Sequence, residues 1–210
     1  MLEHVPAAVV ERLPLYLRCL LKLEDDGYTI LSSKQIGDRL GMDPARIRKD
    51  LAYFGEFGIR GTGYVTADLI YQVRKILGLH KVWNMCVVGA GHLGSALAGY
   101  GGFAKHGLRT AALFDIDPHK VGKNVAGLII QPMEEFMPTA GALELRVGII
   151  TVPGTAAQQV CDLMVRAGLK GIWNFASARV SAPEGTKLRH EDLTLGLMSL
   201  SHYVAGVVAS

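Results

Sequence analysis

The chain has 210 residues, of which half are hydrophobic, and its formal net charge is +3 at pH 7. This length allows one or two domains, and the hydrophobic fraction is high enough to form real cores. No run approaches the ~18 apolar residues that a membrane-spanning helix needs, and residues 1–6 lack the features of a signal peptide. We therefore expect a cytoplasmic protein without a membrane partner.

Charge and cysteine content identify no ligand by themselves. Residues 1–78 contain eleven Lys and Arg residues against ten Asp and Glu residues, so only local clustering of cations can indicate a nucleic-acid partner. Cys19, Cys86 and Cys161 lie far apart in apolar runs, which is typical of reduced packing residues. The histidines form no metal-ligand pair, and we expect no metal.

The first 78 residues predict a helix-turn-helix followed by a wing. Ser32 and Gln35 have the spacing of a capping box, and Gly41 ends the helix that follows. Asp43 precedes Pro44, an arrangement that begins a further helix after a tight turn. The expected helices cover residues 6–23, 33–40, 44–54 and 66–77, and a glycine-containing hairpin is expected over residues 57–65.

The third of these helices has two different faces. Ile47, Leu51 and Phe54 recur at the spacing of a buried face, while cationic and aromatic side chains fall elsewhere. A short turn before such a helix is typical of a recognition helix in the DNA major groove, and an arginine in the wing could enter a minor groove. The alternative is an ordinary solvated face. The side chains concerned are Arg46, Arg48, Lys49, Tyr53 and Arg60.

A dinucleotide-binding pattern begins at residue 82. The apolar strand 82–88 leads into Gly89-x-Gly91-x-x-Gly94, where the glycines permit a tight turn, an approach to a pyrophosphate and close helix–strand packing. Asp115 follows the next strand, 21 residues after Gly94, where a carboxylate usually binds the ribose hydroxyls of NAD. No basic residue comes immediately after Asp115, which favours NAD over NADP.

Later strands predict where the nicotinamide lies. Strands are expected over residues 128–130, 145–151 and 171–174, with a helix over residues 156–167, so the sheet should be mainly parallel. Ligands of such sheets lie beyond the carboxyl ends of the strands. Residues 151–153 and 174–176, at the carboxyl ends of two of these strands, are therefore expected to lie near the nicotinamide.

The predicted site lacks an obvious acid or base for hydride chemistry. His92 lies in the phosphate loop, and residues 151–154 and 174–177 offer no side chain suited to proton transfer. We therefore expect binding without turnover, and not an enzyme. Two alternatives stay open: an NAD-dependent oxidoreductase with an incidental winged helix, and a DNA-binding sensor of another nucleotide ligand.

Several motifs together resemble one known family. The chain contains Ile47-Arg48-Lys49-Asp50-Leu51, Arg60-Gly61-x-Gly63-Tyr64, Phe114-Asp115-x-Asp117-Pro118-x-Lys120-x-Gly122 and Gly171-Ile172-x-Asn174-Phe175-Ala176. In these motifs, which span nearly the whole chain, it resembles the Rex family of redox-sensing transcriptional repressors.

The resemblance implies an α/β fold in three parts. These are a winged-helix DNA-binding domain at residues 1–78, a Rossmann-like NAD(H)-binding domain at 79–189, and a C-terminal helix at 190–210 that is exchanged between subunits. It also implies a homodimer that binds palindromic double-stranded operator DNA when NADH is scarce and releases it when NADH binds, with the ligand not consumed. The expected apolar seam of the exchanged helix comprises Leu193, Leu197, Leu200, Val204 and Val208.

The resemblance also assigns site residues. Ser33 joins the DNA-contacting set, and Asp192 is expected to pair with Arg18 in one state and with Tyr100 in the other. Leu193 and Ser177 stand where relatives carry an aromatic residue and a proline, which bears on the redox set point. The expected dinucleotide-binding residues are Gly89, Ala90, Gly91, His92, Leu93, Gly94, Ala96, Tyr100, Asp115, Thr151, Val152, Pro153, Asn174, Phe175, Ala176 and, from the partner subunit, Leu193.

Overall fold

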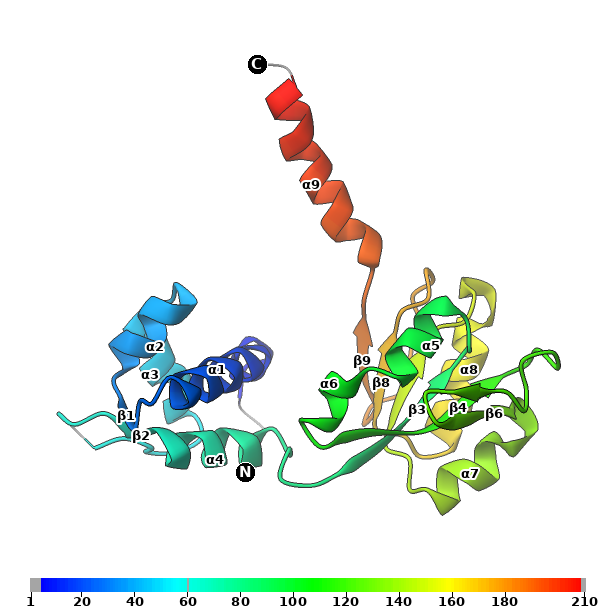
Figure 1. The fold of residues 1–210 in the computed structure, drawn as a ribbon, viewed down its shortest axis with the longest axis horizontal. Coiled ribbons are helices and arrows are strands. Elements are labelled where there is room, and N and C mark those ends of the chain that lie inside the picture. Colours follow the sequence, from blue (N-terminus) through cyan, green and yellow to red (C-terminus); the bar gives the residue numbers. More distant parts are fainter. Residues whose placement is uncertain (1–4, 60, 209–210) are drawn as a thin grey trace. The chain divides into compact units, whose positions relative to one another are not determined.

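The computed structural model describes residues 5–59 and 61–208 and divides the chain into two compact units, residues 1–81 and 82–210 (Figure 1). Each unit has its own hydrophobic core. The domain boundaries expected at residues 78 and 189 stay predictions.

The first unit is built on four helices. Their apolar faces meet in one core that contains Leu13, Ile36, Ile47, Leu51 and Leu69. This burial of one face of each helix stabilises the unit, because helices as short as α2, α3 and α4 are marginal when alone in water. The helices are α1 (Ala7–Asp25), α2 (Ser33–Leu40), α3 (Pro44–Ala52) and α4 (Thr66–Ile76).

Local signals set the start of α2 and α3. The Ser32 hydroxyl accepts a hydrogen bond from the Gln35 amide at 3.2 Å, and the Gln35 side chain accepts one from the Ser32 amide at 2.8 Å. The Asp43 carboxylate accepts the Ala45 amide at 2.8 Å. Gly41 has φ of 63°, which ends α2 in the left-handed region. These contacts confirm the predicted capping box and turn.

The wing differs from the expected hairpin over residues 57–65. Its strand β2 (Tyr64–Val65) pairs antiparallel with β1 (Ile30–Leu31), which precedes α2 in the chain. Among the described residues of the expected hairpin, Ile59 and Gly63 form a bridge, with the Ile59 amide donating to the Gly63 carbonyl at 2.9 Å. The predicted hairpin is therefore present as a short turn between Ile59 and Gly63, and the strand β2 that follows pairs with β1 instead of extending it. Arg60 lies outside the described residues.

The second unit holds a sheet of seven strands within its described residues, in the order β5-β6-β4-β3-β7-β8-β9. Every neighbouring pair is parallel except β5 and β6, which confirms the predicted mainly parallel sheet. The sequence analysis missed β5 and β9. The strands are β3 (Trp83–Val88), β4 (Leu108–Asp115), β5 (Asn124–Val125), β6 (Leu128–Pro132), β7 (Val147–Ile150), β8 (Gly171–Asn174) and β9 (Lys187–His190).

Helices cover both faces of this sheet (Figure 1). On one face α5 (His92–Ala98) and α6 (Gly101–Ala104) pack on a cluster that includes Val87 and Leu113. On the other face α7 (Phe136–Ala142) and α8 (Gly154–Arg166) pack on a cluster that includes Phe114 and Ile150. The strand order reverses at β3, where open α/β sheets bind ligands.

The last helix, α9 (Leu193–Val208), is largely apolar, yet its described side chains, which end at residue 205 and so leave out Val208 of the expected seam, are exposed in the single chain. Exposure is 71% for Leu197, 57% for Leu200 and 63% for Val204. A soluble monomer rarely exposes a continuous apolar surface of this kind, so this surface is typical of an interface. Across the described residues, none of the helices has both the length and the apolar character required to span a bilayer.

Candidate dinucleotide site and nucleic-acid interface

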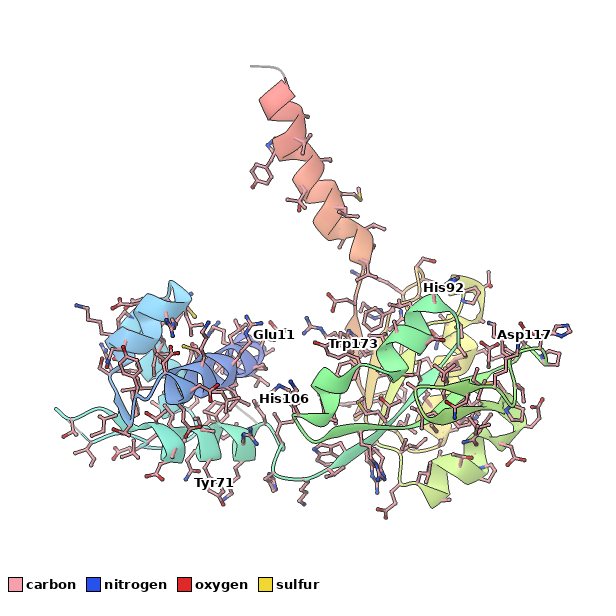
Figure 2. The ribbon with its side chains drawn as sticks, in the orientation of Figure 1. Glu11, Tyr71, His92, His106, Asp117 and Trp173 are labelled. Atoms are coloured by element: carbon pink, nitrogen blue, oxygen red, sulfur yellow. The ribbon has the colours of Figure 1, made fainter. Side chains whose placement is uncertain are left out.

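The loop between β3 and α5 has the geometry of a phosphate cradle. A Cβ atom at Gly94 would overlap the Gly89 carbonyl oxygen and lie 2.6 Å from Thr151 Oγ1, so α5 packs closely on β3 and β7 only because this residue is glycine. A Cβ atom at Gly91 would meet nothing within 4 Å. The space beside Gly91 is therefore open to a ligand, and the start of α5 faces it with His92 (Figure 2).

Asp115 ends β4 beside this loop, and its side chain is 9% exposed. Its Oδ2 accepts hydrogen bonds from the Ala90 amide at 2.7 Å and from Lys120 Nζ at 3.0 Å. Its Oδ1 accepts the Asp117 amide at 2.9 Å. A carboxylate has about four acceptor positions. Three are in use, and one on Oδ1 is left to accept a ribose hydroxyl.

These contacts keep Asp115 ionised. Burial alone would raise the pKa of its carboxyl, but the hydrogen bonds from the Asp117 amide, Lys120 and the Ala90 amide outweigh it and lower the pKa below its usual value. Asp115 is therefore an acceptor at neutral pH, as binding to ribose requires.

A cavity of about 900 Å³ opens beside the loop, at the carboxyl ends of β3, β4 and β7. This volume is within the range that small-molecule and cofactor sites occupy. Six of the residues expected to bind the dinucleotide line it: Gly89, Gly91, Asp115, Thr151, Val152 and Pro153. The residues present therefore fit the adenosine and phosphate part of a dinucleotide.

Of the residues expected around the nicotinamide, residues 151–153 line this cavity, whereas Tyr100, residues 174–176 and Leu193 are not among the lining residues. Asn174 is buried, and its side chain organises the turn after β8 by donating to the Ala178 carbonyl and accepting the Ala176 amide. Phe175 packs on Trp173. Tyr100 and Leu193 are 59% and 60% exposed. One chain therefore brings together Asp115, the glycine loop and residues 151–153, while Tyr100 and Leu193 stay exposed.

Sequence reasoning missed several lining residues. Lys120 was quoted within a motif, but the argument for NAD over NADP considered only the residues directly after Asp115. The structure places this cation on the carboxylate itself. The other missed residues carry no local signal, because separate elements bring them to the cavity; they include Met133, Glu134, Gln159 and Arg166.

The helix α3 presents the expected separation of faces. Ile47 and Leu51 are buried in the core, while Arg46, Lys49 and Tyr53 are exposed. Arg48 is exposed as well, and its guanidinium donates to the Ser33 hydroxyl at 2.7 Å, which connects α3 to the start of α2. Ser33 and Arg48 line a groove of about 620 Å³ together with residues of the segment that leads into β2. The cationic side chains are therefore free to contact phosphates or bases.

A buried carboxylate fixes α3 on α1. Asp50, which is 3% exposed, accepts two hydrogen bonds from Arg12, at 2.6 and 2.8 Å, and one from the Tyr16 hydroxyl at 2.6 Å. Sequence analysis quoted Asp50 in a motif but gave it no role. A two-point contact between arginine and a carboxylate is strong and specific in geometry, so the orientation of α3 is defined.

The same contacts shift the pKa values of this cluster. Burial would raise the pKa of Asp50, but Arg12 and Tyr16 outweigh burial and lower it. Burial, together with the hydrogen bond to Asp50, raises the pKa of Tyr16 to about 12. The hydrogen bond to Asp50 also raises the pKa of Arg12. Asp50 is therefore ionised and Tyr16 neutral across the physiological range.

The three residues expected to form a switch have separate surroundings. Arg18 is exposed on α1, and the ring of Tyr100 packs on Phe103 at 5.0 Å. Asp192 Oδ1 accepts the amide and the hydroxyl of Thr194 at 2.9 and 2.6 Å, in the manner of an N-cap for α9. The pairs of Asp192 with Arg18 and Tyr100 stay predictions.

Comparison with known proteins finds relatives that match nearly the whole length of the chain. A family model described as "CoA binding domain" matches residues 80–178, and one described as "Putative DNA-binding protein N-terminus" matches residues 4–52. A redox-sensing transcriptional repressor Rex from Syntrophobacter fumaroxidans is 43% identical over 96% of both chains. Another, from Brevibacillus brevis, is 45% identical over 96% of this chain and 98% of its own length. The chain belongs to the Rex family of redox-sensing transcriptional repressors.

Solved structures of Rex-family proteins agree with this result. A crystal structure of RSP in complex with β-NAD⁺ and operator DNA has a TM-score of 0.92 and 34% identity, and covers 98% of this chain and 94% of its own. A structure of RSP in complex with β-NADH has a TM-score of 0.87 and 32% identity, and covers 98% and 97%. The Rex-family fold of an N-terminal DNA-binding domain and a Rossmann-like domain is therefore confirmed.

Proposed function

We propose that this chain is a transcriptional repressor that binds operator DNA when NADH is scarce and releases it when NADH binds. The observation that carries the proposal is the glycine-lined cavity beside the buried carboxylate of Asp115, in a chain whose exposed α3 presents cations. The crystal structures of RSP with both dinucleotides and with operator DNA support both ligands. A repressor of this kind acts in the compartment that holds the DNA, the cytoplasm of a bacterium.

Each residue that lines the cavity has a defined part in the proposed binding. Asp115 accepts a ribose hydroxyl, and the loop from Gly89 to Gly94 binds the pyrophosphate at the start of α5. Thr151, Val152 and Pro153 continue the cavity from β7 toward β8, whose carboxyl end carries Asn174, Phe175 and Ala176.

Nicotinamide charge provides the discrimination between the two redox states. The oxidised ring carries a positive charge that resists transfer into an apolar pocket, whereas the reduced ring is neutral. The proposed pocket comprises Ala96, Tyr100, Pro153, Phe175 and Leu193 of the partner subunit. None of these side chains is a strong general acid or base near neutral pH, so we propose that the dinucleotide is bound and not turned over.

We further propose a homodimer in which α9 packs across the two subunits. The exposed apolar side chains of α9 need a cover, and a two-fold dimer presents two α3 helices to one duplex. The half-sites of the operator should then lie one helical turn, about 10 base pairs, or a multiple of it apart. The proposed DNA contacts are Ser33, Arg46, Arg48, Lys49, Tyr53 and Arg60.

A binding assay at fixed salt tests the proposal. A palindromic duplex selected by the protein from a random-sequence pool is labelled, and its fluorescence anisotropy is followed while NADH, and separately NAD⁺, is added. Salt is fixed because phosphate contacts depend strongly on it. We expect NADH to release the duplex at concentrations at which NAD⁺ has little effect. Binding that ignores both dinucleotides would contradict the proposal, and hydride transfer to added substrates would favour the oxidoreductase.

A further inference from the structure

Four aromatic rings form a connected row in the second unit. Tyr100 packs on Phe103 with ring centroids 5.0 Å apart, Phe103 on Trp173 at 6.3 Å, and Trp173 on Phe175 at 4.5 Å. These distances are typical of edge-on and tilted aromatic pairs. Trp173 lies between Phe103 and Phe175 in this row and is only partly buried, so a movement of either neighbour moves the indole.

The same indole is hydrogen-bonded to the segment that leads into α9. The Trp173 N–H donates to Glu191 Oε2 at 3.3 Å, and the Glu191 amide donates to the Asn174 carbonyl at 2.9 Å. Trp173 also lies opposite Arg189 in the pairing of β8 with β9. Glu191 directly precedes Asp192, which caps the first turn of α9.

We propose that Trp173 is a positioning residue that couples occupancy of the dinucleotide site to the placement of the segment Glu191–Leu193. This inference rests on the proposed function, because Phe175 is the residue expected against the nicotinamide. A ring that binds on Phe175 shifts Trp173, and the shift changes the hydrogen bond to Glu191. At 3.3 Å this bond is at the long limit for N–H···O geometry, so a small movement of the indole breaks it.

Substitutions at the two ends of this bond test the coupling. Trp173→Phe keeps an aromatic ring against Phe103 and Phe175 but removes the N–H, and Glu191→Leu removes the acceptor. The readout is the ratio of operator Kd with and without saturating NADH. We expect each variant to reduce this ratio by about threefold to tenfold, the effect of one hydrogen bond, while operator affinity without ligand stays within about twofold. The double variant should lose no more than either single one.

Two control variants separate this bond from its neighbours. Arg189 donates to the same Glu191 oxygen at 3.2 Å from an exposed position, so Arg189→Ala should leave the ratio unchanged. Glu191→Gln keeps an acceptor for the indole and should retain the coupling. A parental ratio in Trp173→Phe, or additive losses in the double variant, would overturn the inference.

A measurement without DNA keeps the inference separate from the proposed function. Hydrogen exchange of the amides at residues 191–196 is followed with and without NADH. We expect NADH to change the exchange rate in the parental chain and to change it less in Trp173→Phe. If this difference appears in a chain that does not release its operator, the proposed function fails and the coupling stands. If NADH changes the exchange equally in both chains, the coupling is wrong.

Discussion

Two buried carboxylates define the two sites of this protein at the scale of single residues. Asp50 and Asp115 each accept three hydrogen bonds, and each has a lowered pKa despite burial. Asp50 orients the helix that carries the cations, whereas Asp115 retains one acceptor position for a ligand. The same chemical group thus serves a structural role in one unit and, in the proposed function, a binding role in the other.

The cluster around Asp50 predicts a pH dependence of stability. Because the folded pKa of Asp50 is lowered, its contribution is fully present above its unfolded pKa of about 4 and is lost as the pH falls through the lower folded value. We expect Asp50→Asn to lower the free energy of unfolding by about 2–3 kcal/mol at pH 7 and by less below pH 4. Urea unfolding at several pH values measures this, and a pH-independent difference would contradict it.

Tyr16 predicts a second dependence, at alkaline pH. Its pKa is raised to about 12, so its contribution is fully present below its unfolded pKa of about 10 and is lost as the pH rises from there to about 12. Tyr16→Phe removes this group, and its unfolding midpoint should fall less over that interval than that of the parent. Equal slopes in the two proteins would show that other groups are responsible.

Gly91 and Gly94 form a matched pair in the phosphate loop. Gly91→Ala adds a methyl group to open space, so we expect a melting temperature within about 2 °C of the parent and an NADH affinity at least about tenfold lower. Gly94→Ala forces a methyl group onto the Gly89 carbonyl and should lower stability as well. Thermal melts and calorimetric titration measure both effects. Parental NADH binding by Gly91→Ala would mean that the pyrophosphate lies elsewhere.

At the scale of elements, the described apolar side chains of α9 are exposed in the single chain and need a partner surface to cover them. Leu197→Glu combined with Val204→Glu places charges in the expected seam, so we expect the dimer to dissociate and the affinity for palindromic DNA to fall at least about tenfold. Leu197→Met is the control because it preserves an apolar side chain of similar volume. Sedimentation of the free proteins measures the association state. A charged variant that stays dimeric would place the interface elsewhere.

The elements also show how far sequence reasoning extended. The helices of the first unit followed from local signals, since Ser32 with Gln35 and Asp43 with Pro44 act through neighbouring residues. The pairing of β1 with β2 did not, because it depends on residues distant in the chain. The start of α4 shows the same limit, because Val65 takes the N-cap position without a side-chain hydrogen bond and the Thr66 hydroxyl is buried without a partner among the described residues.

The dinucleotide site shows the same limit. Gly89, Gly91 and Asp115 could be predicted because the loop needs glycine, and ribose needs a carboxylate, at fixed spacing. Glu134 and Arg166 could not, because the packing of separate elements brings them to the cavity, whereas the role of Lys120, five residues after Asp115, was overlooked. Asn174 was expected to line the ligand, and its side chain in this structure holds the turn after β8.

For the whole molecule, the central claim is that one chain couples a dinucleotide site to a DNA site. Coupling of this kind is reciprocal: if NADH weakens operator binding by some factor, the operator must weaken NADH binding by the same factor. Calorimetric titration of NADH into the free protein, and into the protein saturated with the selected duplex, measures that factor directly. We predict that NADH affinity falls on the duplex by the factor seen in the anisotropy assay. Equal NADH affinity in the two titrations would contradict the account.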